Sequence, residues 1–132
     1  MIRAVLADTG PLYAANDETD VHHERALREL KNFSRDRREI LIPYPILLEA
    51  YSLLLFKLGT RAALGWLSEV ADASFVNLTP EDYTRGFTTV RTLADQRISL
   101  VDATLGALAY RMGLEVWTYD HHFDVMRVPV WR

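Results

Sequence analysis

Hydrophobic residues along this chain form short continuous runs that alternate with longer segments of helical spacing. Each short run has the length and composition of a buried strand, and most of them end at a turn-forming residue. We predict strands at residues 2–7, 39–42, 74–78, 114–119 and 128–131.

The longer segments predict helices of two kinds. Residues 20–34 place apolar side chains on one face, whereas residues 45–58 are apolar nearly all round, which indicates a buried or interface helix. Two further helices begin at capping residues, Thr79 before a proline and Ser99 before an early acid. We predict helices at residues 20–34, 45–58, 60–71, 80–94 and 99–112.

Strands that alternate with helices through short connections predict a parallel sheet covered by helices on both faces. The expected fold class is therefore α/β, a three-layer α/β/α sandwich with a central parallel sheet. The chain has 132 residues and shows no linker, repeat or low-complexity segment. We expect one domain over residues 1–132, large enough for a hydrophobic core.

Four carboxylates interrupt otherwise apolar surroundings, namely Asp8, Glu49, Asp102 and Asp120. Asp8 and Asp120 follow predicted strands, whereas Glu49 and Asp102 lie in the first turns of predicted helices. Ligands of parallel sheets bind at the carboxyl ends of the strands, so we expect the four acids to meet there. Carboxylates that lie close together repel each other, and Mg²⁺ or Mn²⁺ would relieve this because hard cations prefer oxygen ligands. Such a site supports phosphodiester hydrolysis.

Most of these acids also have a local explanation. Asp8 and Asp120 are typical turn formers, and Asp102 completes a capping box. Glu49 has no such explanation, because its neighbours one turn away are apolar and offer no cation. A shared position at one edge of the sheet favours the metal site over separate local roles.

Composition narrows the possible functions. The formal net charge of −3 argues against a general nucleic-acid binder but not against a metal-dependent nuclease, whose acids add to that total. The chain contains no cysteine, which excludes disulfides, zinc–thiolate sites and thiol catalysis. No apolar run reaches the roughly 18 residues of a membrane span. The first residues lack the long apolar region of a signal peptide, so we expect a cytoplasmic protein with no membrane partner.

Four segments carry the acids in a recognisable order: Leu6-Ala7-Asp8-Thr9, Leu48-Glu49, Ile98-Ser99-Leu100-Val101-Asp102-Ala103 and Thr118-Tyr119-Asp120-His121-His122-Phe123. In order and spacing they resemble a PIN domain, specifically a VapC-type toxin of a type II toxin–antitoxin system. The resemblance covers nearly the full length. It implies an endoribonuclease that hydrolyses RNA phosphodiester bonds with Mg²⁺ or Mn²⁺. It also implies a homodimer and a cognate antitoxin that blocks the site.

The resemblance assigns roles to individual acids. Asp8, Glu49 and Asp102 match the catalytic, metal-binding acids of the family, and Asp120 matches the fourth acid. Asp124 is a candidate fifth ligand, with a solvated turn residue as the equal alternative.

Neighbouring residues receive supporting roles. Thr9 matches the hydroxyl residue beside the first acid, and Thr118 is expected to help orient the metal ligands from behind. Phe123 is expected to pack beneath the site.

The histidines occur in two adjacent pairs. Neighbours on a helix point about 100° apart, so neither pair is a natural chelate. We expect His22 and His23 to be exposed at a helix start. His121 or His122 is a candidate contact to RNA phosphate.

Two other enzyme or signalling classes fit less well. The triplet Asp8-Thr9-Gly10 resembles that of retroviral-type aspartic proteases, but those proteins are nearly all β. A response-regulator receiver needs an acidic pair after the first strand and an aspartate after the third, and both are missing here. Two alternatives stay open: a catalytically weak PIN-fold module that binds RNA or protein, and a metal-dependent DNA nuclease.

Overall fold

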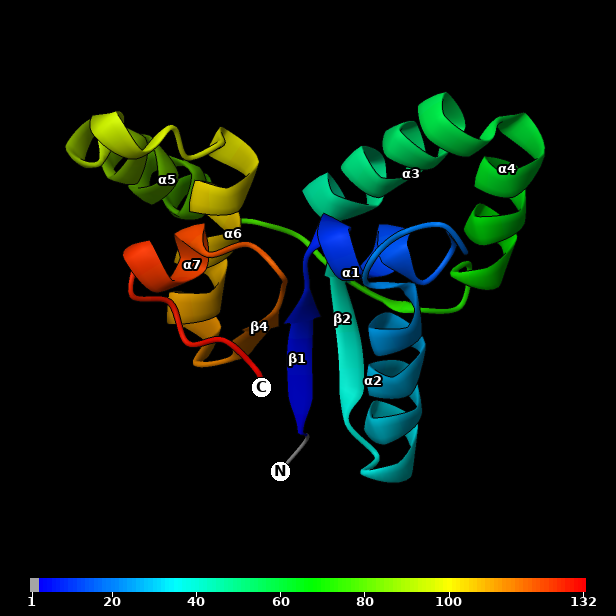
Figure 1. The fold of residues 1–132 in the computed structure, drawn as a ribbon. Coiled ribbons are helices and arrows are strands. Elements are labelled where there is room, and N and C mark those ends of the chain that lie inside the picture. Colours follow the sequence, from blue (N-terminus) through cyan, green and yellow to red (C-terminus); the bar gives the residue numbers. More distant parts are fainter. Residues whose placement is uncertain (1–2) are drawn as a thin grey trace.

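The computed structural model describes residues 3–132 and is built around a parallel sheet of four strands (Figure 1). The strands are β1 (Ala4–Ala7), β2 (Glu39–Pro43), β3 (Ser74–Val76) and β4 (Glu115–Trp117). Their spatial order is β3-β2-β1-β4, and Leu6 pairs with Leu41 on one side and Val116 on the other. The predicted central parallel sheet flanked by helices is confirmed.

β1 lies in the interior of the sheet, and all of its residues are buried. A continuous apolar run is what a parallel strand covered on both faces requires. The prediction for this strand began at residue 2, but Ile2 lies outside the described residues. β1 begins at Ala4.

The helices surround this sheet in the predicted order. They are α1 (Thr9–Ala14), α2 (His23–Arg35), α3 (Tyr44–Leu58), α4 (Thr60–Glu69), α5 (Pro80–Thr92), α6 (Leu100–Met112) and α7 (His122–Val125), with a short 3₁₀ turn at Ala94–Gln96. Local chemistry sets several boundaries: Thr79 and Asp82 form a capping box at α5, and the hydroxyl of Ser99 accepts the N–H of Asp102. Gly59, with a φ of 96°, makes the turn between α3 and α4.

Two predictions about local structure differ from the structure. Residues 128–131 form one isolated bridge, Val116 with Val130, in place of a strand, because Pro129 has no N–H to extend a ladder. α1 was not predicted, since Gly10-Pro11 is a turn signal. Pro11 fits there because the first turn of a helix needs no N–H donors from its own residues.

Two groups of helices flank the end of β1 from which the chain enters α1 (Figure 1). α3 and α4 pack together on one side, and α5, α6 and α7 lie on the other. α1 follows β1 directly and lies between these groups, against α3. Helices from both halves of the chain therefore lie near the carboxyl end of β1.

Within residues 3–132, every helix falls short of the length and hydropathy that crossing a lipid bilayer requires.

The close approach of α5 and α6 generates a stability prediction. A Cβ atom on Gly86 would lie 2.8 Å from Cγ2 of Thr104 and 3.2 Å from its backbone N. Because the backbone has to shift, Gly86→Ala should lower the free energy of unfolding by about 1–3 kcal/mol. Urea denaturation of the purified variant measures this loss.

Gly65→Ala is the matched control for that substitution. Gly65 lies in α4, where no atom of the described residues is within 4 Å of an added Cβ. Alanine should therefore stabilise the protein by about 0.5–1 kcal/mol through helix propensity. A stabilising effect of Gly86→Ala would contradict the packing described for α5 and α6.

Candidate functional site

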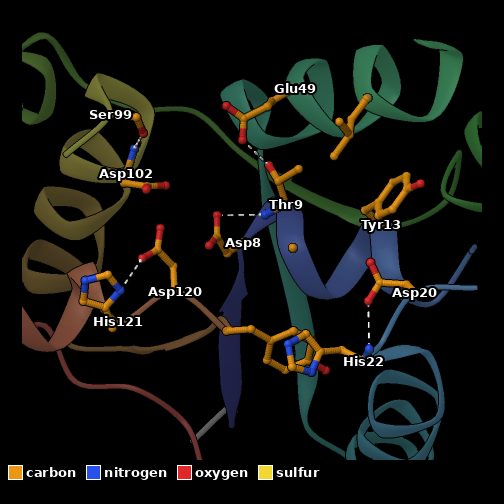
Figure 2. Close-up of a pocket in the computed structure, with 13 residues that line it drawn as sticks. Asp8, Thr9, Tyr13, Asp20, His22, Glu49, Ser99, Asp102, Asp120 and His121 are labelled. Carbon is orange, nitrogen blue, oxygen red and sulfur yellow. Dashed lines mark hydrogen bonds and ion pairs between the residues drawn. The ribbon is translucent and has the colours of Figure 1, made fainter. Parts of the chain in front are cut away.

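A cavity of about 500 Å³ lies at the carboxyl ends of β1 and β4, and all four predicted acids line it (Figure 2). Asp8 caps α1 directly after β1, and Asp120 follows β4. Glu49 reaches the cavity from α3, whereas Asp102 reaches it from the first turn of α6. Residues separated by more than a hundred positions in the sequence thus meet at one edge of the sheet.

Asp8 is the most deeply buried of these acids, with 5% of its surface exposed. Its Oδ1 accepts the backbone N–H of Thr9 at 2.8 Å, and its Oδ2 accepts the hydroxyl of Thr118 at 2.7 Å. Burial raises the pKa of Asp8 to about 6, although both hydrogen bonds act to lower it. The carboxylate is therefore fixed in position but costly to ionise.

Asp102 and Asp120 affect each other's pKa. Burial raises the pKa of Asp102 to about 8, and the charge of Asp8 and a hydrogen bond with Asp120 act in the same direction. Burial opposes ionisation of Asp120 too, but the N–H of His122, 2.9 Å from its Oδ1, and the hydrogen bond with Asp102 lower its pKa. The two carboxyl groups therefore titrate together, and burial favours keeping a proton between them over ionising both.

Glu49 joins the cluster through Thr9. The hydroxyl of Thr9 donates to Oε1 of Glu49 at 2.5 Å, while the N–H of the same residue donates to Asp8. Figure 2 shows Thr9 between the two acids. One buried threonine thus sets the positions of a carboxylate on α3 and a carboxylate at the end of β1.

The threonine on the other strand has a similar double role. The hydroxyl of Thr118 donates to Asp8 and accepts the N–H of Asp120 at 3.0 Å. Both threonines named from the sequence therefore contact the acids. Phe123 is fully buried, as expected for a residue that packs beneath the site.

Two histidines follow Asp120 closely. Nδ1 of His122 lies 3.2 Å from Oδ1 of Asp120, and Nδ1 of His121 lies 3.7 Å from the same atom. The three residues can bring one ligand atom each within 4.8 Å of one another. His121 faces the cavity, whereas the side chain of His122 is mostly buried beside it.

The expectation that His22 and His23 are exposed is wrong. Both are half-buried, because Oδ1 of Asp20 accepts the N–H of His22 at 2.8 Å and folds the start of α2 inward. His22 lines the cavity and packs on Tyr119, with 4.7 Å between ring centroids. Nδ1 of His23 lies 2.7 Å from the carbonyl oxygen of Ala14.

Asp124 does not line the cavity that the four acids share. Its carboxylate pairs with the guanidinium of Arg132, at 2.8 and 3.1 Å, and both side chains are exposed. The prediction of a fifth acid at this cavity therefore needs correction. An arginine close by in sequence provides the charge partner.

Several cavity residues were not predicted from the sequence, namely Tyr13, Asp20, His22 and Tyr119. Tyr13 lies one turn after Thr9 on α1, so the helical spacing would have indicated it if that helix had been predicted. Tyr119 immediately precedes an expected site residue. Asp20 lies in a loop, and its position depends on how that loop folds back over the sheet.

The donor set suits a hard divalent cation. The four acids offer carboxylate oxygens, and threonine hydroxyl and backbone N–H groups hold two of them in place. Burial, together with the charges of neighbouring acids, raises the pKa of Asp8 and Asp102, and a cation among the acids would favour their charged forms. The arrangement is thus chemically able to bind a metal and act on a phosphate ester.

Comparisons with solved structures identify proteins of the same fold. VapC20 of Mycobacterium tuberculosis, a sarcin–ricin loop cleaving toxin, is 20% identical, with a TM-score of 0.82 over 97% of this chain and 98% of its own. VapBC2 from Rickettsia felis, bound to a fragment of promoter DNA, is 14% identical, with a TM-score of 0.73 over 98% and 97%. DNA-bound VapBC from Salmonella typhimurium is 18% identical, with a TM-score of 0.69 over 100% and 96%.

The sequence itself was compared with curated proteins and with models of protein families. No curated protein matches the chain at a significant level. A family model of the PIN domain, by contrast, matches residues 5–129. This match spans nearly the whole sequence and includes all four acids. The chain therefore belongs to the PIN-domain family.

Proposed function

We propose that this protein is a VapC-type toxin, an endoribonuclease that hydrolyses RNA phosphodiester bonds with Mg²⁺ or Mn²⁺. The observation that carries this proposal is the convergence of Asp8, Glu49, Asp102 and Asp120 on one cavity. The shared fold with VapC20, a toxin that cleaves the sarcin–ricin loop, supports RNA as the substrate class.

In this proposal Asp8 and Asp102 are the principal metal ligands, and Glu49 and Asp120 complete the acidic set. Thr9 and Thr118 hold the carboxylates in place through the hydrogen bonds described above. These acids would hold a divalent cation, which would polarise the phosphodiester and make water a stronger nucleophile at neutral pH. The cavity admits a phosphate group because it is open to solvent at the sheet edge.

Two alternatives compete with this assignment. A PIN-fold module that binds RNA or protein without efficient catalysis would not need a complete acid set, so the four converging carboxylates favour the nuclease. A metal-dependent DNA nuclease would use the same acids. The likeness to an RNA-cleaving toxin favours RNA over DNA.

The proposal includes two protein partners, a cognate antitoxin and a second copy of the chain, and action in the cytoplasm. Exposed apolar side chains on α3 and α4 support a protein-binding surface. Leu48 is 66% exposed and Phe56 84%, and Leu64 on α4 is also exposed. Exposed apolar side chains mark interaction surfaces where they form a contiguous patch. Two of the structural neighbours are VapBC assemblies.

Cleavage assays test the proposed chemistry. The wild type should cut RNA, including a sarcin–ricin stem-loop, when Mg²⁺ or Mn²⁺ is added, and chelation should stop the reaction. Asp8→Asn and Asp102→Asn should each lower the cleavage rate by about 100-fold or more, since each removes a charged ligand. Gel-resolved time courses measure the rates.

Asp72→Asn is the matched control. It makes the same change of charge, and Asp72 is exposed in the loop between α4 and β3. It should cleave at the wild-type rate. Wild-type rates in both Asp8→Asn and Asp102→Asn would show that the site is misassigned. RNA binding by a wild type that cleaves with neither metal would favour the binding module.

The raised pKa values predict a proton-linked metal effect. Asp8, with a pKa raised to about 6, and Asp102, with a pKa raised to about 8, stabilise the metal-free fold while protonated. This contribution is lost as the pH rises through these values. A cation must displace the protons, so the increase in Tm on adding Mg²⁺ or Mn²⁺ should be small below pH 6 and largest above pH 8.

Thermal unfolding over a pH series, with and without metal, measures this linkage. Asp102→Asn serves as the comparison, since it removes the group with the higher pKa and should flatten the dependence near pH 8. An equal metal-induced shift in Tm across the whole range would contradict the proposed ligands.

A further inference from the structure

A second cavity, of about 260 Å³, adjoins the acidic one. The two cavities share Tyr119, Asp120 and His121 in their linings, and the second adds Arg25 together with the ion pair of Arg132 and Asp124. Two guanidinium groups thus lie next to the acidic cavity, beside the short segment after β4. A strand that crosses this segment would pass from the acids to the arginines.

A buried network fixes the position of Arg25. Glu29, 8% exposed, accepts the indole N–H of Trp117 at 3.1 Å and the hydroxyl of Tyr119 at 2.5 Å. Nε of Arg25 lies 3.5 Å from the same Oε1 of Glu29. The guanidinium carbon also lies 4.2 Å above the centre of the Tyr119 ring. Ion pairing and stacking together hold this arginine beside the cavity.

Arg25 is therefore prepared to bind an anion. Its side chain is 43% exposed, so the guanidinium remains accessible although Glu29 and Tyr119 hold it in place. A planar guanidinium suits the oxygens of a phosphate, and a side chain that is already ordered loses less conformational entropy on binding. The stacking on Tyr119 links this cation directly to the wall of the acidic cavity, which Tyr119 also lines.

Arg132 adds a second cation to the same cavity. It pairs with Asp124, but both side chains are largely exposed, and exposed ion pairs contribute little stability. A phosphate can compete for such a guanidinium more readily than for a buried one. We therefore expect Arg25 to contribute more than Arg132.

The negative charge of the acidic cavity explains why neighbouring cations would help RNA to bind. RNA is a polyanion, and four carboxylates repel its backbone wherever a cation does not neutralise them. Cations directly beside the acids attract the strand at the next position along its backbone. The chain as a whole is negative, with a net charge of −3, so attraction has to come from local clusters.

We propose that Arg25, assisted by Arg132, binds the RNA phosphate next to the one placed at the four acids. This inference rests on the proposed ribonuclease function and adds a phosphate-binding subsite to it. Glu29 is a positioning residue in this scheme, because it acts on the RNA only through Arg25 and Tyr119.

The test measures RNA binding in the Asp102→Asn background, where cleavage is slow. The probe is a fluorescein-labelled single-stranded RNA of about 12 nucleotides, followed by anisotropy over a salt series. Arg25→Ala should raise Kd by about 5- to 10-fold, since it removes charge-assisted hydrogen bonds. It should also reduce the slope of log Kd against log salt concentration by about 0.7, the value for one phosphate contact on a single strand.

Three further variants make the result specific. Arg28→Ala is the matched control, because Arg28 lies on the same helix and is exposed, away from both cavities. It should leave Kd and the salt slope at their parent values. Arg25→Lys keeps the charge without the planar stacking and should give an intermediate Kd. Arg132→Ala, which shortens an exposed side chain, should raise Kd by about 2- to 3-fold.

The outcomes separate this inference from the function on which it rests. Parent values of Kd and slope in both Arg25→Ala and Arg132→Ala overturn the subsite, as does an equal loss in Arg28→Ala. Failure of the parent protein to bind the RNA at low salt overturns it as well. Absence of metal-dependent RNA cleavage by the wild type would instead refute the ribonuclease, whatever Arg25→Ala does to binding.

Discussion

Negative charge buried at the carboxyl end of β1 is the constraint around which the rest of this structure is arranged. Asp8 is 5% exposed, and Glu49, Asp102 and Asp120 line the same cavity. A buried carboxylate is costly unless hydrogen bonds or a cation compensate for it. Hydrogen bonds from Thr9 and Thr118 provide part of that compensation for Asp8, and burial raises the pKa of Asp102. The same features leave the cluster ready for a divalent cation.

The parallel topology makes this arrangement possible. β1 lies between β2 and β4, so the segments after β1 and β4 leave the sheet side by side and bring their acids together. α3 begins directly after β2 and carries Glu49 to the same edge. Close packing of α5 on α6 supports the first turn of α6, where Asp102 lies. Residues far apart in the sequence therefore form one site at this edge of the sheet.

Much of this could be predicted from residue patterns. Continuous apolar runs indicated the parallel strands, and the rule that ligands bind at strand ends brought the four acids together. Contacts between residues far apart in the sequence, and local departures from the usual patterns, could not be predicted in this way. α1 begins at Thr9 despite Gly10-Pro11, and the partners of Glu29 lie 88 and 90 positions away. Asp124 was predicted as a candidate fifth ligand, and its actual pairing with Arg132 depends on how residues 126–132 fold back.

The central claim is that Asp8 and Asp102 together hold a divalent cation, next to two guanidinium groups for the RNA backbone. Anomalous diffraction from crystals of the protein grown with Mn²⁺ tests it most directly. The account predicts a peak within coordination distance of both carboxylates, and its loss in crystals of Asp8→Asn. A peak only at Asp120, His121 and His122, where ligand atoms can also gather, or the same peak in Asp8→Asn, would contradict it.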